Sequence, residues 1–132
     1  MDNNTGSVKK YDISTPEALA SSIVKILDEK LAGDIRLLHV TEKTIIADYF
    51  VICTGTSTTQ IRALSGEIEY LIGESGQKPG HIEGLPEANW ICMDYHSVIV
   101  HIFNEENRAN YRLEKLWEDA EEVDIKEALT ER

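Results

Sequence analysis

The sequence is short of positive charge. Its 132 residues include 13 lysines and arginines against 24 aspartates and glutamates, a formal net charge of −11 at pH 7. Proteins whose main ligand is nucleic acid use clustered lysine and arginine to displace counterions from phosphates. The composition therefore argues against nucleic acid as the primary ligand and favours a basic protein partner.

Cysteine and long apolar runs are also scarce. The two cysteines, Cys53 and Cys92, lie far apart inside apolar runs, so they make neither a disulfide framework nor a zinc motif and are expected to be buried. No stretch reaches the ~18 apolar residues of a membrane helix, and the polar N-terminus has no signal-peptide segment. We therefore expect a soluble, cytoplasmic protein with no membrane partner.

The apolar residues that are present, 42% of the chain, can fill the core of one domain. We expect residues 1–13 to be a disordered leader, residues 14–117 to be a single domain, and residues 118–132 to be an acidic tail, because five of the seven residues in 118–124 are carboxylates.

Hydrophobic periodicity predicts three helices, which begin near residues 14, 57 and 104. Five short apolar or β-branched runs predict strands, and the last two should form a hairpin. The fold class is therefore α/β (α+β), a mixed five-stranded sheet with helices packed on it. The predicted strands are residues 35–40, 49–53, 81–82, 90–94 and 98–103.

A glycine turn joins the second strand to the second helix. Gly55 turns the chain, and Ser57 and Gln60 have the spacing of a capping box at a helix N-terminus. Such a turn can also hold phosphate, which leaves nucleotide binding as an alternative. The stretch has no P-loop lysine, no G-x-G-x-x-G motif and no D-x-D pair to hold magnesium, so a structural turn is favoured and no cofactor is expected.

Two interpretations of residues 90–101 compete. Asp94, His96 and His101 could form a metal or catalytic site, but Asp94 and His96 flank a turn and need not approach His101. Alternation instead places Trp90 and Asp94 on one strand face and Ile91, Met93 and Tyr95 on the other. Tryptophan, tyrosine and methionine carry binding energy at protein interfaces, although Trp90 could equally belong to the core.

Several motifs in order make the chain resemble the ribosomal silencing factor family, also called the Iojap or YbeB-like family. The resemblance runs from about Pro16 to Ala120. It rests on Asp48, Phe50, Val51, Ile52, Thr54, Gly55, Ser57, Gln60, Glu83, Gly84, Trp90, Asp94, Val100, His101, Arg108, Tyr111, Leu113, Glu114, Leu116 and Trp117. One departure is His96-Ser97, where the family has Gly-Asp, so the hairpin turn must form without glycine.

The resemblance implies a regulator that is not an enzyme. It implies a core similar to that of nucleotidyltransferases without their catalytic carboxylates, binding to the large ribosomal subunit through ribosomal protein uL14, and a steric block to subunit joining that represses translation when nutrients are scarce. On this view the partner-binding residues are Trp90, Ile91, Met93, Asp94, Tyr95 and His101. A homodimer of the free protein remains open.

Overall fold

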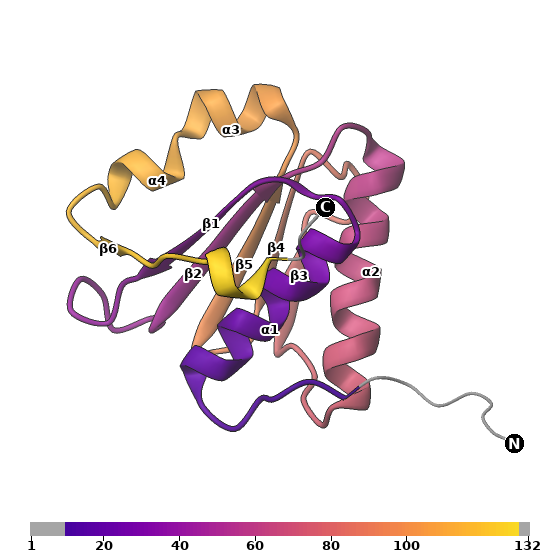
Figure 1. Cartoon of the computed structure of the whole chain (residues 1–132). Helices are drawn as coiled ribbons and strands as arrows, with labels where there is room; N and C mark the ends of the chain where they lie inside the picture. Colours follow the sequence, from indigo (N-terminus) through magenta and orange to yellow (C-terminus); the bar gives the residue numbers. More distant parts are fainter. Residues whose placement is uncertain (1–9, 130–132) are drawn as a thin grey trace, which may run out of the picture.

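The computed structural model describes residues 10–129, the Leu116 side chain excepted, and within them six strands form one mixed sheet with helices on its two faces (Figure 1). The fold class and the five predicted strands are confirmed; a sixth strand was not predicted. The helical elements are α1 (Pro16–Glu29), α2 (Thr58–Glu74), α3 (Glu105–Tyr111), α4 (Leu113–Leu116) and the 3₁₀ turn η1 (Lys126–Ala128). The strands are β1 (Gly33–His39), β2 (Tyr49–Thr54), β3 (His81–Glu83), β4 (Trp90–Asp94), β5 (Val98–Phe103) and β6 (Glu121–Glu122).

The strand order in the sheet is β3-β4-β5-β2-β1-β6. Strands β2 and β5 pair in parallel, and the other neighbours pair antiparallel, including the expected β1–β2 and β4–β5 pairs. Strand β3 runs in the same direction as β2, as a strand–helix–strand connection favours. It is nevertheless separated from β2 by β4 and β5.

Helices α1 and α2 cover one face of the sheet and bury the main core (Figure 1). Helix α1 begins at Thr15, whose hydroxyl accepts the Ala18 N–H at 3.0 Å, with Pro16 at the first helical position. Alternation along the strands sends Val51 and Val100 to this face, where both are fully buried. This burial of apolar surface is the main force that holds helices and sheet together.

The turn before α2 is shaped by close packing at Gly55. A Cβ atom on Gly55 would lie 2.5 Å from Cγ1 of Ile61, which is fully buried. Ser57 Oγ accepts the Gln60 N–H at 3.0 Å, and Gln60 Oε1 accepts the Thr56 N–H at 2.6 Å. The glutamine thus reaches one residue further back than in a standard capping box, and both polar groups serve to start the helix.

Helices α3 and α4 lie over part of the opposite sheet face (Figure 1). The sequence predicts one helix here, but the chain breaks at Arg112, which has a left-handed φ of +49°. The break returns Leu113 and Trp117 to the sheet, and the Trp117 ring meets Phe50 edge-on at 5.5 Å. Because both helices are short, they cover only one side of this face.

The acidic segment expected to be a solvated tail adds the sixth strand instead. Glu121 and Glu122 pair with His39 and Leu38 of β1, and the Val123 N–H donates to Leu37 O at 2.8 Å. Val123, Ile125 and Ala128 follow and are partly buried against the main core. Charged residues separate these apolar ones, so the segment can pack inward while its charged side chains face water.

Part of the predicted leader also packs on the domain. The Tyr11 side chain is buried in the main core, and its backbone N–H donates to Ser75 Oγ at 2.9 Å. Ile13 is partly buried beside it. Residues 1–9 of the leader lie outside the described part of the chain.

The β4–β5 hairpin turns at His96 and Ser97, and it does so without glycine. His96 adopts a φ of +70°, a region that side chains with a Cβ disfavour. Asp94 Oδ1 accepts the His96 N–H at 2.7 Å, and the Ser97 N–H donates to Tyr95 O at 2.9 Å. The aspartate therefore holds a strained turn in place.

Replacing His96 with glycine should stabilise the protein. The strain at positive φ disappears, so we expect His96→Gly to be more stable than His96→Ala by about 1 kcal/mol. The alanine variant is the matched control because both lose the imidazole while only one keeps a Cβ. Urea denaturation of the two variants measures the difference, and equal midpoints would show that the turn carries no strain.

Candidate partner-binding surface

The sheet face opposite α1 and α2 remains open over β3 and β4. Trp90, Cys92 and Asp94 of β4 point to this side and are all partly exposed, and His81 and Glu83 of the edge strand β3 are exposed beside them. We call these five residues the open face. It lies beside the part of the sheet that α3 and α4 cover.

Trp90 is fixed in place at one end of the open face. Its ring stacks on Phe103 at 4.8 Å and contacts Tyr111 of α3 at 4.7 Å. Its indole Nε1–H donates to Nδ1 of His101 on β5 at 3.2 Å. A partly exposed tryptophan whose ring is held by its neighbours offers a large, rigid contact surface that loses little entropy on binding.

His101 supports Trp90 from inside the sheet. Its side chain is buried, and burial lowers the pKa of the imidazole to about 4, so the ring is neutral near pH 7. Because Nδ1 accepts the indole hydrogen, the ring proton is on Nε2, which has no hydrogen-bond partner. His101 thus positions the tryptophan and is itself not exposed to a partner.

The remaining predicted contact residues occupy the opposite side of β4. Ile91, Met93 and Tyr95 are 0 to 1% exposed and belong to the main core beneath α2. Alternation separated the two groups correctly, but it could not show which side the helices cover. The structure corrects the predicted set: these three side chains have no surface for a partner, and Trp90 and Asp94 do.

The structure also places the residues of the alternative metal site. Asp94 and His96 meet through the turn, where the carboxylate accepts a backbone N–H, while His101 pairs with Cys92 further along the hairpin. Among the described residues, no three histidine, cysteine or carboxylate side chains come together as a metal ion requires. The Asp94 carboxylate instead stabilises the hairpin turn by accepting the His96 N–H.

The two cysteines lie on opposite sides of the sheet and are both free. Burial raises the pKa of Cys53 to about 12, and burial, together with Glu83 and Asp94, raises the pKa of Cys92 to about 11. Thiols with such pKa values are protonated near pH 7 and are poor nucleophiles. Cys92 contributes apolar surface to the open face.

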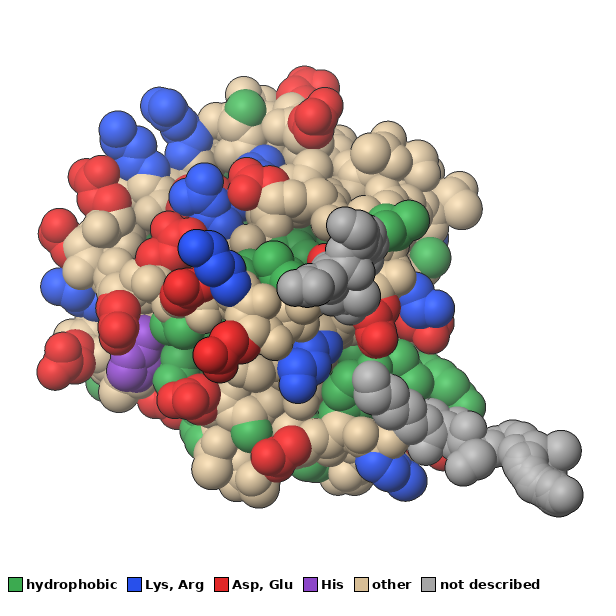
Figure 2. Space-filling view, in the orientation of Figure 1, with side chains coloured by type: hydrophobic (Ala, Val, Ile, Leu, Met, Phe, Trp, Pro, Cys, Tyr) green, Lys and Arg blue, Asp and Glu red, His purple; other side chains and the backbone are tan. Residues whose placement is uncertain are grey.

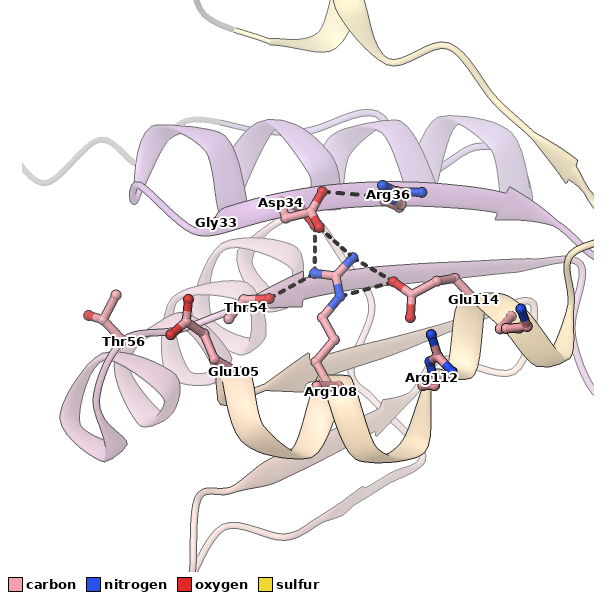
Figure 3. Close-up of a pocket in the computed structure, with 11 residues that line it drawn as sticks. Gly33, Asp34, Arg36, Thr54, Thr56, Glu105, Arg108, Arg112 and Glu114 are labelled. Carbon is pink, nitrogen blue, oxygen red and sulfur yellow. Dashed lines mark hydrogen bonds and ion pairs between the residues drawn. The ribbon is translucent and has the colours of Figure 1, made fainter.

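Arg108 of α3 forms a buried polar cluster that our sequence analysis did not predict (Figure 3). Its Nε and Nη2 donate to Glu114 Oε2 at 3.0 and 2.8 Å, and its Nη1 donates to Asp34 O and Thr54 Oγ1 at 2.7 and 2.8 Å. The guanidinium lies against a cavity of about 760 Å³. It links α3 and α4 to β1 and β2 and thereby fixes the helices that border the open face.

Carboxylates dominate the surface. Figure 2 shows acidic side chains crowded on the side of the molecule that carries β6 and the β1–β2 loop. Glu83, Glu87 and Asp94 bring the same charge to the open face and the loop beside it. In the described residues, no helix has the length and apolar character needed to cross a bilayer.

The chain is thus an α/β domain with a fixed, partly exposed tryptophan on an open sheet face. Comparison with known proteins gives the family. A model described as "ribosomal silencing factor during starvation" matches residues 13–132, so the chain belongs to the ribosomal silencing factor family, a family of regulatory proteins.

Individual relatives agree with this assignment. The chain is 41% identical over 108 residues to the ribosomal silencing factor of Bacillus subtilis, covering 79% of this chain and 92% of that protein. It is 35% identical over 101 residues to a mouse protein named mitochondrial assembly of ribosomal large subunit protein 1, covering 72% of this chain and 43% of that protein. A crystal structure from Bacillus halodurans superposes with a TM-score of 0.71 at 33% identity, covering 83% of this chain and 99% of the other.

Proposed function

We propose that this protein binds the large ribosomal subunit through ribosomal protein uL14 and sterically prevents the small subunit from joining. The open face makes the contact, and Trp90 contributes the largest share of the binding energy. One observation carries this assignment: the Trp90 ring is partly exposed although Phe103, Tyr111 and His101 hold it rigidly. Rigid aromatic side chains of this kind are common hot spots of protein interfaces.

The charge of the protein supports a basic protein as the partner. The net charge of −11 and the carboxylates of Glu83 and Asp94 on the open face would repel the phosphates of ribosomal RNA. The same charges attract lysine and arginine side chains and speed encounter with a basic surface. The proposal therefore assigns the contact to a ribosomal protein.

Size alone makes a block of subunit joining feasible. A compact domain of this length has a radius of gyration of about 14 Å and is roughly 35 Å across. Subunit joining requires direct contact between the two ribosomal surfaces, so a domain bound to uL14 on the joining side would hold them apart. On this proposal the protein acts in the cytoplasm, under nutrient limitation, and needs neither a catalytic step nor a cofactor.

The free protein leaves Trp90 partly exposed on the open face. Two copies could pair through Trp90 and exchange this contact for uL14 when large subunits are present. We propose such a homodimer of the free protein because an exposed aromatic ring favours association, although the carboxylates of the two copies would repel each other.

Replacing Trp90 with alanine tests the proposed contact. The change should raise the dissociation constant for uL14 about thirtyfold, equivalent to about 2 kcal/mol, because a large rigid aromatic contact is lost. Binding is measured by biolayer interferometry with purified uL14, and urea denaturation on the same sample gives the folded fraction. Tyr70→Ala is the control, since Tyr70 is 53% exposed on α2, away from the open face.

Three outcomes are informative. A folded Trp90→Ala variant with weak binding, beside normal binding by Tyr70→Ala, is the expected result. Full binding by the folded Trp90→Ala variant would remove Trp90 from the interface. Failure of the unmodified protein to bind uL14 or large subunits would contradict the proposed function as a whole.

A further inference from the structure

The loop between β1 and β2, residues 40–48, exposes two neighbouring isoleucines at its tip. Ile45 is 103% exposed and Ile46 is 60% exposed, whereas Ala47 next to them is buried. Single apolar residues at a protein surface are ordinary. Two large ones side by side on a projecting loop, which we call the isoleucine knob, form an apolar patch that gains free energy when a partner covers it.

The base of this loop is held by hydrogen bonds, so the isoleucine knob has a defined position. The Val40 N–H donates to Asp48 O at 2.7 Å, and Thr41 Oγ1 donates to Asp48 Oδ1 at 3.0 Å. Nearer the tip, the Ile46 N–H donates to Thr44 Oγ1 at 3.2 Å. A loop already fixed in one shape pays little ordering cost when it binds.

Carboxylates line two hollows next to the loop that carries the isoleucine knob. A hollow of about 400 Å³ beside the loop is lined by Glu17 and Asp48, and a second hollow of about 220 Å³ is lined by Glu42, Asp119 and Glu121. His39 lines both hollows and Lys43 lines the second, and these are their basic residues. An apolar projection with acidic flanks is complementary to an apolar pocket bordered by lysine or arginine.

Trp90 lies at one end of the open face, and the loop lies beyond the other end. The Asp48 N–H donates to Ser97 O at 2.8 Å, which places the loop beside the β4–β5 turn. Trp90 pairs with Phe103, which is six residues beyond Ser97, so the base of the loop lies about 20 Å from Trp90 along β5. An interface of ordinary size, about 800 Å² on each partner, is wide enough to include both.

We propose that the isoleucine knob is a second contact for the same basic ribosomal protein and inserts into an apolar pocket flanked by its cationic side chains. This inference rests on the proposed function and adds a specific element to it. The five carboxylates that line the hollows beside the loop favour a protein over RNA as the occupant. Trp90 and the isoleucine knob then contact one partner at two separate points, which fixes the orientation of the bound domain.

A double variant, Ile45→Ser with Ile46→Ser, tests this inference on the full chain. Its urea midpoint should stay close to that of the parent, because neither side chain is buried. Its dissociation constant for isolated uL14 and for whole large subunits should rise at least about tenfold, mainly through faster dissociation. Leu31→Ser is the matched control, an aliphatic side chain that is 67% exposed after α1, outside the loop.

The same set of proteins separates the two proposals. If the parent binds and Trp90→Ala weakens binding while the double serine variant binds normally, the isoleucine knob is not a contact although the proposed function stands. Weaker binding to subunits with unchanged binding to isolated uL14 would assign the knob to another ribosomal component and overturn the inference. Loss only of self-association, measured by sedimentation, would make it a contact between copies and overturn it too. A parent that binds neither target contradicts both proposals.

Discussion

Replacing Arg108 with methionine should lower the free energy of unfolding by about 3 kcal/mol, the lower end of the range for breaking a buried ion pair. Methionine keeps the length of the side chain but removes the donors to Asp34 O, Thr54 Oγ1 and Glu114 Oε2. The Glu114 side chain is 25% exposed, so water can solvate part of the carboxylate that is left behind. That partial solvation keeps the expected loss at the lower end.

Two further variants identify the cause of that loss. Arg108→Lys should recover little stability, because one ammonium group cannot reach three acceptors arranged around a planar guanidinium. Arg108→Met combined with Glu114→Gln should be more stable than Arg108→Met alone, because no unpaired buried charge remains. Urea denaturation of all three measures this. A loss below about 1 kcal/mol for Arg108→Met would show that the cluster is not an important link between α3 and the sheet.

His101 should make the protein sensitive to acid. The pKa of the imidazole is about 4 in the folded protein against 6.5 ordinarily, so as the pH falls below 6.5 the unfolded state takes up a proton first. The contribution to stability is complete above pH 6.5 and is lost between pH 6.5 and about 4. At about 1.4 kcal/mol for each pKa unit, the expected loss is about 3 kcal/mol.

His101→Gln removes this titration while keeping an acceptor for the Trp90 indole. Its free energy of unfolding should therefore fall less steeply between pH 6.5 and 4 than that of the parent. His81→Gln is the control, the same substitution at a histidine whose side chain is 65% exposed on β3. Identical slopes for the parent and His101→Gln, in urea titrations at several pH values, would mean that His101 is not held neutral by the fold.

Local sequence patterns located most of the fold. Apolar periodicity and capping residues placed α1 and α2, and alternation in residues 90–95 sorted Trp90 and Asp94 from Ile91, Met93 and Tyr95. The side that is buried depends on where α1 and α2 pack, which is a long-range property. For that reason the predicted binding set mixed exposed side chains with core ones.

Two features had no local signal. Strand β6 consists of two glutamates, which have low strand propensity. It forms because β1 offers a free edge and because Val123 and Ile125, which follow it, are partly buried against the core. Arg108 and Glu114 are six residues apart, so one continuous helix would not place them on the same side. The left-handed residue Arg112 brings them together, and nothing in the sequence around it predicts that break.

The helix break and the buried arginine have a functional consequence on our proposal. Tyr111, the last residue of α3, contacts the Trp90 ring, so the position of α3 affects the shape of the open face. A variant of Arg108 that stays folded should therefore also bind uL14 less tightly. The polar cluster around Arg108 thus fixes α3, and α3 in turn positions Trp90 for binding.

Subunit joining measured by light scattering tests the central proposal most directly. Purified large subunits are incubated with saturating protein, small subunits are added, and the rise in scattering reports joined ribosomes. The account predicts that the unmodified protein suppresses this rise and that Trp90→Ala, at a concentration where it is folded, suppresses it far less. A full rise in scattering while the unmodified protein is bound to the large subunit, as shown by pelleting of the same mixture, would contradict a steric block.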